Sequence, residues 1–366
     1  SDFSELEGTI VVELERLLFR QDWDTQREGE IIYINTGDQV NASAPGSVIE
    51  RSRSRTGLKL MDRPMDWHGK IAVGHVRNSS IVSGRENIEL AIIGKLSTPV
   101  ARKLEQWIQV GIENLKYLYG RLPVSDVQIL VFPLGYHSDP VPWREVMRGA
   151  GDAVHLYVDS TRSLEELNRN WVLTHELSHF VHPYLTGADA WLSEGIASYY
   201  QNVLNARSDS LDVESVWKKL HAGFKRGIAQ VNRVDTLARD TRSMLRQRQY
   251  IRVYWSGAAI ALISDVQYHD RSDGATSLDA MLAEFSTCCL PSRRRWRALE
   301  LMTKLDDIAR HCLRYNYGDE VRTILALSHA VTDGKTGIMA NIAANDNDDV
   351  IAAAEAILAS KNLIII

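Results

Sequence analysis

The sequence predicts an α+β protein with an antiparallel β domain at its N-terminus, a central core with a small sheet, and a mostly helical C-terminal domain. Short apolar runs broken by turn residues occur up to about residue 95, whereas apolar residues at helical spacing dominate from about residue 213. Both patterns occur between these regions. Because 366 residues exceed what one hydrophobic core usually serves, we divide the chain into residues 1–95, 96–212 and 213–366.

Four short apolar runs predict the strands of the N-terminal domain. They occupy residues 9–14, 31–34, 70–73 and 88–93, and Gly, Asn, Pro and Ser residues separate them. Short strands joined by such turn residues are typical of antiparallel sheets. We therefore expect an antiparallel β domain over residues 8–95.

One helix and two strands are predicted at the start of the central region. Apolar residues recur at helical spacing over residues 102–119, and Gly120 follows at a position typical of a helix C-cap. Residues 127–132 and 153–158 are apolar runs of strand length. Together with the helices that follow, they predict an α+β core.

The C-terminal region is predicted to be mostly helical. Helical spacing extends over residues 213–318, and the clearest helix covers residues 254–266. After residue 319, a polar run at 345–349 precedes a further predicted helix that extends through Ser360.

The five residues from His175 to His179 read His-Glu-Leu-Ser-His. Residues 164–174 before them show helical spacing, and Pro183 disfavours helical geometry just beyond them, so the motif is expected in a helix. Two histidines four residues apart lie on the same helix face, where both imidazoles can reach one Zn²⁺. Glu176 would then lie beside the open coordination position.

A third metal ligand is expected fifteen residues after His179, at Glu194. Ser193 is a plausible N-cap for a second helix that opens at Gly195, and a turn is expected near Gly187. Two helices joined in this way can bring two histidines and one glutamate to the same ion. Such a ligand set with an open fourth position is a standard catalytic zinc site, which makes one Zn²⁺ ion the expected cofactor.

His182 is a rival third ligand, because it follows His175 by seven residues and lies on roughly the same helix face. Its position is about 10 Å further along the helix axis, which is more than one tetrahedral ion spans comfortably. A histidine near the last carbonyls of a helix is its alternative interpretation. Glu194 is therefore the favoured ligand.

This arrangement predicts the hydrolysis of a peptide or amide bond. Zinc lowers the pKa of a bound water, and Glu176 would accept a proton from that water and pass it to the leaving amine. The oxyanion that forms needs a second donor, usually a tyrosine or a histidine. Spacing alone does not select this donor among the 13 tyrosines.

Two segments carry a resemblance to a known family. The run His175–His179, followed by Trp-Leu-Ser-Glu-Gly-Ile-Ala-Ser-Tyr at 191–199, resembles the gluzincin metallopeptidases of the aminopeptidase N and glycyl aminopeptidase type. The resemblance implies a thermolysin-like catalytic core in which Glu194 is the third zinc ligand. Tyr254-Trp-Ser-Gly257 stands where this family carries Y-x-K-G, which implies that Tyr254 stabilises the oxyanion.

The resemblance extends downstream and also has departures. Asp265, Ser277-Leu278-Asp279 and Met281 are similar to a helix and an S-L-D-x-x-M segment of glycyl aminopeptidases, although the methionine comes one residue sooner. Ser256 replaces the family's lysine. The gap between the second histidine and the third ligand is shorter than in aminopeptidase N.

A candidate substrate-binding residue, Asp152, stands at the end of the Gly-Ala-Gly-Asp run at 149–152. At this place the family carries a glutamate that binds the free α-amine of the substrate. Asp152 is one methylene shorter, so the implied aminopeptidase activity depends on whether its carboxylate still reaches an amine. A solvated aspartate in a glycine-rich turn is the alternative.

The sequence thus predicts a zinc metallopeptidase that acts on peptide or protein substrates, with an aminopeptidase implied by the resemblance. One alternative is an endopeptidase or dedicated processing protease of the same fold. Another is a non-catalytic peptide-binding protein, which would have no need to retain Glu176.

The net charge and the hydropathy of the chain limit the partners and the location that we expect. The net charge of −5 over this length favours neither nucleic acid nor a membrane surface as a partner. The chain has no apolar run of the ~18 residues that a transmembrane helix requires. The resemblance favours a periplasmic or exported protein over a cytoplasmic one. An arginine cluster at 293–297 is expected to be a solvated face, with an anionic partner as the alternative.

Overall fold

The structure is a computed structural model that describes residues 69–313 with short gaps, and seven strand segments between residues 4 and 59. The gaps are residues 84–85, 119, 125, 149–150, 209, 231–236, 249, 272–276 and 293. The predicted helix through Ser360 lies outside the described residues. Contacts divide the chain into two compact units, Ser1–Ile112 with Val124–Val172 and Glu113–Pro123 with Leu173–Ile366.

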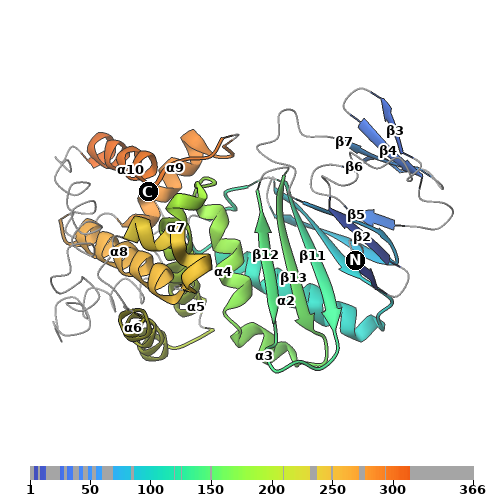
Figure 1. Ribbon diagram of the computed structural model, residues 1–366, viewed down its shortest axis with the longest axis horizontal. Coiled ribbons are helices and arrows are strands. Elements are labelled where there is room, and N and C mark those ends of the chain that lie inside the picture. Colours follow the sequence, from blue (N-terminus) through green and yellow to red (C-terminus); the bar gives the residue numbers. More distant parts are fainter. Residues whose placement is uncertain are drawn as a thin grey trace. The chain divides into compact units, whose positions relative to one another are not determined.

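The first unit contains two four-stranded antiparallel sheets from the N-terminal region (Figure 1). One has the order β1 (Ser4–Leu6), β2 (Thr9–Glu13), β8 (Lys70–Gly74) and β5 (Asn41–Ser43). The other has the order β3 (Thr25–Glu28), β4 (Ile31–Asn35), β7 (Arg55–Lys59) and β6 (Val48–Arg51). Three of the predicted apolar runs form β2, β4 and β8, which confirms these strands.

A five-stranded mixed sheet is the core of the first unit. Its order is β12 (Trp143–Met147), β13 (Asp152–Asp159), β11 (Asp126–Leu134), β10 (Glu86–Ile93) and β9 (Val76–Ser83). Strand β10 pairs with β11 in parallel, so a crossover must join them, and helix α2 (Thr98–Leu115) supplies it. The sheet therefore continues past residue 95, where the sequence suggested a boundary. The three-part division of the chain stays a prediction.

Helix α2 packs through the apolar face that its periodicity predicted. Leu104, Trp107 and Ile108 are buried, and the indole nitrogen of Trp107 donates a hydrogen bond to the carbonyl oxygen of Leu167 at 3.1 Å. Beyond the helix, the Gly120 amide donates to the carbonyl oxygen of Lys116 at 2.7 Å. The φ of +72° at Gly120 is in the left-handed region, which confirms the predicted glycine cap.

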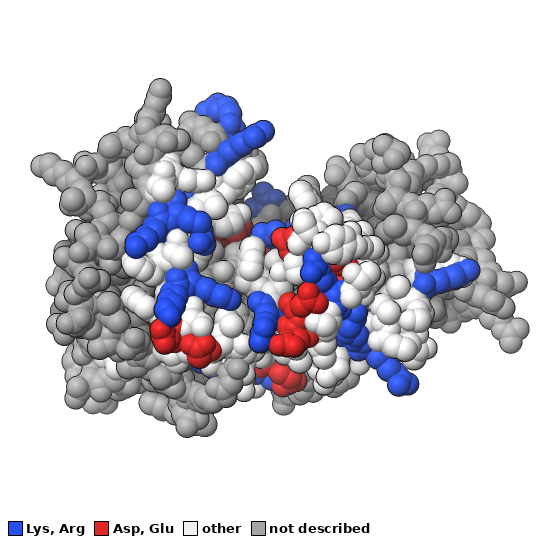
Figure 2. Space-filling view, turned by 90° about the horizontal axis from the view of Figure 1, so that it is seen from below, with Lys and Arg blue, Asp and Glu red and all other residues white. Residues whose placement is uncertain are grey.

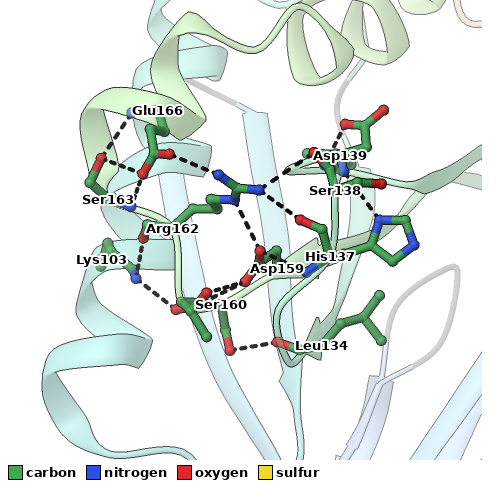
Figure 3. A network of polar contacts seen from close by, with 12 residues as sticks. Lys103, Leu134, His137, Ser138, Asp139, Asp159, Ser160, Arg162, Ser163 and Glu166 are labelled. Atoms are coloured by element: carbon green, nitrogen blue, oxygen red, sulfur yellow. Dashed lines mark hydrogen bonds and ion pairs between the residues drawn. The ribbon is translucent and has the colours of Figure 1, made fainter.

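A polar network fastens the loops that follow β11 and β13 (Figure 3). The Asp159 carboxylate accepts hydrogen bonds from the backbone amides of His137 and Thr161 and from the guanidinium of Arg162. Lys103 on α2 donates to the carbonyl oxygens of Ser160 and Arg162, at 2.7 and 2.5 Å. The buried Asp159 carboxylate thus joins the two loops, and Lys103 attaches helix α2 to the second of them.

The second unit is mostly helical, as the sequence predicted for residues 213–318 within the part that the structure describes. Its long helices are α5 (Ala190–Arg207), α6 (Val213–Ala229), α7 (Leu237–Gln247), α8 (Tyr250–Arg271), α9 (Leu278–Cys289) and α10 (Ala298–Leu313). Helix α5 packs against both α8 and α6, and its residues are buried over most of its length. A helix covered on all sides in this way is the centre of the unit.

A buried polar network joins α5 to α8 and α9. The hydroxyl of Tyr199 donates to Asp265 at 2.6 Å, and the hydroxyl of Tyr200 donates to Asp279 at 2.7 Å. Arg207 forms an ion pair with Asp279. Burial and the charge of Asp279 raise the pKa of Asp265 to about 6. Asp265 and Asp279 are two of the residues that carry the family resemblance, and they orient α8 and α9 on the central helix.

Two predicted helix boundaries near the motif are wrong. The stretch before it is broken into α3 (Leu164–Arg169) and α4 (Val172–Ser178), because Asn170 is extended and its side chain accepts from the Val172 amide at 2.9 Å. Helix α5 begins at Ala190, so Ser193 lies within its first turn instead of capping it. The 3₁₀ turn η2 (Gly187–Asp189) leads directly into the helix and moves its start forward.

The described surface carries charges of both signs. On the face shown in Figure 2, acidic side chains lie beside basic ones. Among the helices that the structure describes, none combines the length and the apolar composition of a membrane span.

Candidate metal centre

The His-Glu-x-x-His motif lies where helix α4 passes into a tighter turn. Helix α4 carries His175 and Glu176, and His179 opens the 3₁₀ turn η1 (His179–Val181). The chain is extended at His182, directly before Pro183, where the proline was expected to disfavour helical geometry. All three motif residues, His175, Glu176 and His179, are buried.

Helix α5 brings Glu194 to the two histidines. The ligand atoms of His175, His179 and Glu194 all lie within 4.8 Å of one another. The Nε2 atoms of His175 and His179 are 3.2 and 3.7 Å from the same Glu194 carboxylate oxygen. Two imidazoles and one carboxylate converging in this way fit the donor set of a catalytic zinc ion. The structure therefore brings together the three residues that the sequence selected.

Two further residues hold the imidazoles, and sequence reasoning missed both. The Nδ1 atom of His175 lies 2.7 Å from the amide oxygen of Gln201, which can only accept, so this nitrogen carries the proton. The Nδ1 atom of His179 lies 3.2 Å from the hydroxyl of Ser193. The bond to Gln201 leaves Nε2 of His175 for a metal, and donation from Nδ1 of His179 to Ser193 would leave Nε2 of His179 in the same way. Spacing could have indicated Gln201, because it follows Glu194 by seven residues on the same face of α5.

Charge interactions set the protonation of the cluster. Burial by itself raises the pKa of Glu194, but nearby His179 and His175 and a hydrogen bond from Tyr254 outweigh it and lower that pKa. Burial lowers the pKa of His175, but Glu194 and Glu176 outweigh it and raise that pKa. Glu194 is thus held in the carboxylate form that binds cations.

Tyr254, which the family resemblance selected, lies next to the cluster on α8. Its hydroxyl hydrogen-bonds to the Glu194 carboxylate. Its ring lies nearly parallel to that of His175, with an angle of 19° and 6.4 Å between the centroids. A phenol hydroxyl is thereby placed at the same carboxylate as the two imidazoles.

His182, the rival ligand, is outside the ligand cluster. Its Nδ1 atom lies 2.8 Å from the carbonyl oxygen of Pro183, and its Nε2 atom lies 3.4 Å from the hydroxyl of Ser193. Its ring packs edge-on against that of His179, with 5.8 Å between the centroids. The cluster therefore contains Glu194, the ligand that the sequence favoured, and not His182.

Asp152 is the first residue of β13 and belongs to the other compact unit. Its carboxylate is 3.2 Å from the guanidinium of Arg148, and both side chains are largely buried. Burial raises the pKa of Asp152, although Arg148 opposes this shift. Residues 149–150 of the glycine-rich run lie outside the described residues.

The arginine cluster borders the loop between the two motif segments. The Trp296 amide donates to the carbonyl oxygen of Tyr184 at 2.8 Å, and the Thr186 amide donates to that of Trp296 at 2.9 Å. Arg297 pairs with Asp189 at 2.9 Å, directly before α5. The guanidinium of Arg294 lies over the Trp296 ring, 4.2 Å from its centroid. Within the described residues, this cluster therefore braces the loop that leads to Glu194.

Comparisons of the whole chain agree with this picture at the level of the fold. No family model matches the sequence, and no curated protein matches it. Among solved structures, an aminopeptidase N family protein from Idiomarina loihiensis matches with a TM-score of 0.55 and 12% identity, over 82% of this chain and 59% of that one. Yeast LTA4 hydrolase matches with a TM-score of 0.55 and 10% identity, over 90% of this chain and 53% of that one.

A mutant form of an M1 zinc metallopeptidase from Deinococcus radiodurans, bound to a Tyr-Ser-Ala substrate, matches with a TM-score of 0.50 and 17% identity, over 86% of this chain and 72% of that one. This chain spans about three fifths of the length of the Idiomarina protein and about half that of the yeast protein. The chain thus has the fold of M1 zinc metallopeptidases, which confirms the resemblance that the sequence motifs indicated.

Proposed function

We propose, from the fold shared with M1 zinc metallopeptidases, that this protein is a zinc-dependent metallopeptidase that hydrolyses peptide bonds. The convergence of His175, His179 and Glu194 within 4.8 Å carries the proposal. These three side chains would hold one Zn²⁺ ion. The buried carboxylate of Glu176 beside them supports a hydrolytic role over a purely structural one.

When bound, zinc supplies a Lewis acid that acidifies water and polarises a carbonyl group. Glu176 is the general base, and its carboxylate takes a proton from the attacking water. The same carboxylate then delivers this proton to the nitrogen of the leaving amine, which completes the cleavage of the amide bond. The charge of Glu176 acts on His175, which supports its place at the centre.

Tyr254 is proposed to stabilise the oxyanion. Its hydroxyl is a neutral donor at the edge of the ligand cluster, and it hydrogen-bonds to Glu194. Donation from this hydroxyl to the oxygen of the scissile carbonyl would lower the energy of the transition state more than that of the ground state.

Aminopeptidase activity is the finer proposal, and it rests on the neighbouring structures and on Asp152. A buried carboxylate can bind the ammonium group of a peptide N-terminus. Arg148 already pairs with Asp152, so an incoming amine would share or displace that partner. An endopeptidase or processing protease of the same fold is the alternative.

The experiment is a hydrolysis assay of the purified chain on a peptide panel, after a chelator and after zinc is returned. We expect cleavage only with zinc. Pairs of peptides with free and acetylated N-termini separate the two activities, because loss of cleavage on acetylation indicates an aminopeptidase. A chain that holds one equivalent of zinc and cleaves no member of the panel would contradict the proposal and favour a peptide-binding role.

A further inference from the structure

We propose that His182 is a positioning residue that sets, through Ser193, the tautomer of His179 that binds a metal. The inference rests on the proposed function only in taking His179 as a metal ligand. His182 is buried, with 1% of its surface exposed, and it is not needed as a ligand because Glu194 fills that role.

The backbone fixes the proton on His182. Its Nδ1 atom lies 2.8 Å from the carbonyl oxygen of Pro183, and a carbonyl oxygen can only accept. Nδ1 therefore carries the proton, and in the neutral ring Nε2 is an acceptor. This acceptor lies 3.4 Å from the hydroxyl oxygen of Ser193, so the hydroxyl donates to His182.

The direction of this hydrogen bond decides which ring nitrogen of His179 carries the proton. Ser193 also lies 3.2 Å from Nδ1 of His179. A hydroxyl has one proton, and since it is directed at His182, Ser193 accepts from Nδ1 of His179. The chain of donors therefore runs from His179 through Ser193 and His182 to the Pro183 carbonyl. It leaves a lone pair on Nε2 of His179, which faces Glu194.

The two proposed metal-binding histidines differ in how the proton on the ring is fixed. Gln201 presents an amide oxygen to His175, and this group accepts whatever its neighbours do. A serine hydroxyl can turn and donate instead. In that orientation Nδ1 of His179 would accept and Nε2 would carry the proton, which blocks metal binding. His182 removes this second orientation, and ring packing against His179 holds it in place.

Zinc affinity of the full chain, measured by competition with a chromophoric chelator, tests the inference. His182→Phe keeps an aromatic ring against His179 and removes the acceptor. We expect it to weaken zinc binding about 10- to 100-fold, the usual effect of losing a partner of a ligand. His182→Gln, whose amide oxygen can accept from Ser193, should recover most of the affinity. His221→Phe on α6, outside the ligand cluster, is the matched control and should leave it unchanged.

A second pair of variants keeps the test decisive if His182→Phe does not fold. Ser193→Ala should weaken zinc binding to a similar extent, whereas Ser193→Thr retains the hydroxyl and should not. Because both residues act in one chain, the double variant His182→Phe/Ser193→Ala should be little worse than either single variant.

Three results would overturn the inference: unchanged affinity in folded His182→Phe, equal losses in Ser193→Ala and Ser193→Thr, or additive losses in the double variant. The metal-free forms should unfold at the same temperature as the wild type, since a merely structural role would shift that temperature. A chain that shows these affinity differences but cleaves no peptide would contradict the proposed peptidase function alone.

Discussion

The backbones of Gly195 and Gly257 are in direct contact: a Cβ atom on Gly195 would lie 2.3 Å from the carbonyl carbon of Gly257. Helices α5 and α8 meet at this point. Gly195 follows the proposed ligand Glu194, and Gly257 lies one helical turn after Tyr254. The close approach of the two helices therefore places the Tyr254 hydroxyl at the Glu194 carboxylate.

Gly257→Ala is expected to destabilise the protein and weaken zinc binding. The added Cβ would lie 1.9 Å from the backbone carbonyl oxygen of Trp191, so α5 and α8 must move apart. Overpacking of this kind costs about 1–3 kcal/mol, and more where backbone must move. Urea unfolding and zinc titration measure the two effects. Gly187→Ala is the control, because its Cβ would meet nothing within 4 Å. Equal stability and equal zinc affinity in the two variants would contradict the role of the contact between α5 and α8.

Glu176→Gln is expected to abolish hydrolysis and to leave zinc bound. The amide keeps the size of the side chain but cannot take a proton, and general bases typically contribute about 10²- to 10⁴-fold to the rate. Metal analysis should still find one equivalent of zinc, since Glu176 is outside the ligand cluster. Glu165→Gln, an exposed change on α3, controls for loss of a charge. Turnover at the wild-type rate in Glu176→Gln would exclude this residue as the base.

Tyr254→Phe is expected to lower kcat by about 10²- to 10³-fold with little change in KM. This pattern follows if the hydroxyl acts mainly in the transition state. Tyr250→Phe is a matched control, because Tyr250 lies one turn earlier on α8, with its ring centroid 6.5 Å from that of Tyr254. A rise in KM with kcat unchanged would show that Tyr254 binds substrate rather than the oxyanion.

The convergence of His175, His179 and Glu194 could be predicted because it depends on residues that are close in the sequence. The spacing of His175 and His179 follows from helix geometry, and Glu194 from a second helix nearby in the sequence. Gln201 and Ser193 were missed because their roles depend on which face of α5 meets α4. The spacing of residues indicates which of them share one face of a helix, but it does not indicate which element packs against that face.

The elements that the fold prediction missed or misplaced also depend on their surroundings in the folded chain. Strands β11 and β13 are mostly apolar runs, as expected for strands that are buried on both faces of the sheet. Strand β12, with the sequence Trp-Arg-Glu-Val-Met, was missed because it is a short edge strand in which two charged residues interrupt the apolar ones. The start of α5 was misplaced because Asp189 and Ser193 are equally good N-cap residues by type. The 3₁₀ turn before Ala190 decided between them.

Acid should weaken the first unit through Asp159 (Figure 3). Burial works to raise the pKa of Asp159, but hydrogen bonds from Thr161, His137 and Arg162 outweigh it and lower that pKa from 3.8 to about 2. The folded state thus binds the proton less readily than the unfolded state does. The stabilisation is present above about pH 4 and is lost as the pH falls towards 2.

Asp159→Asn is expected to lower the free energy of unfolding by roughly 1–3 kcal/mol at pH 7, because an amide accepts these hydrogen bonds poorly. Its stability should then change less than that of the wild type between pH 4 and 2. Urea unfolding at several pH values measures both effects. Asp139→Asn, in the same network, is the control. The Asp139 side chain accepts a hydrogen bond from the Val141 amide, and because this side chain is only half-buried, its replacement should cost less. A wild-type stability that stays flat from pH 4 to 2 would show that Asp159 does not hold these loops.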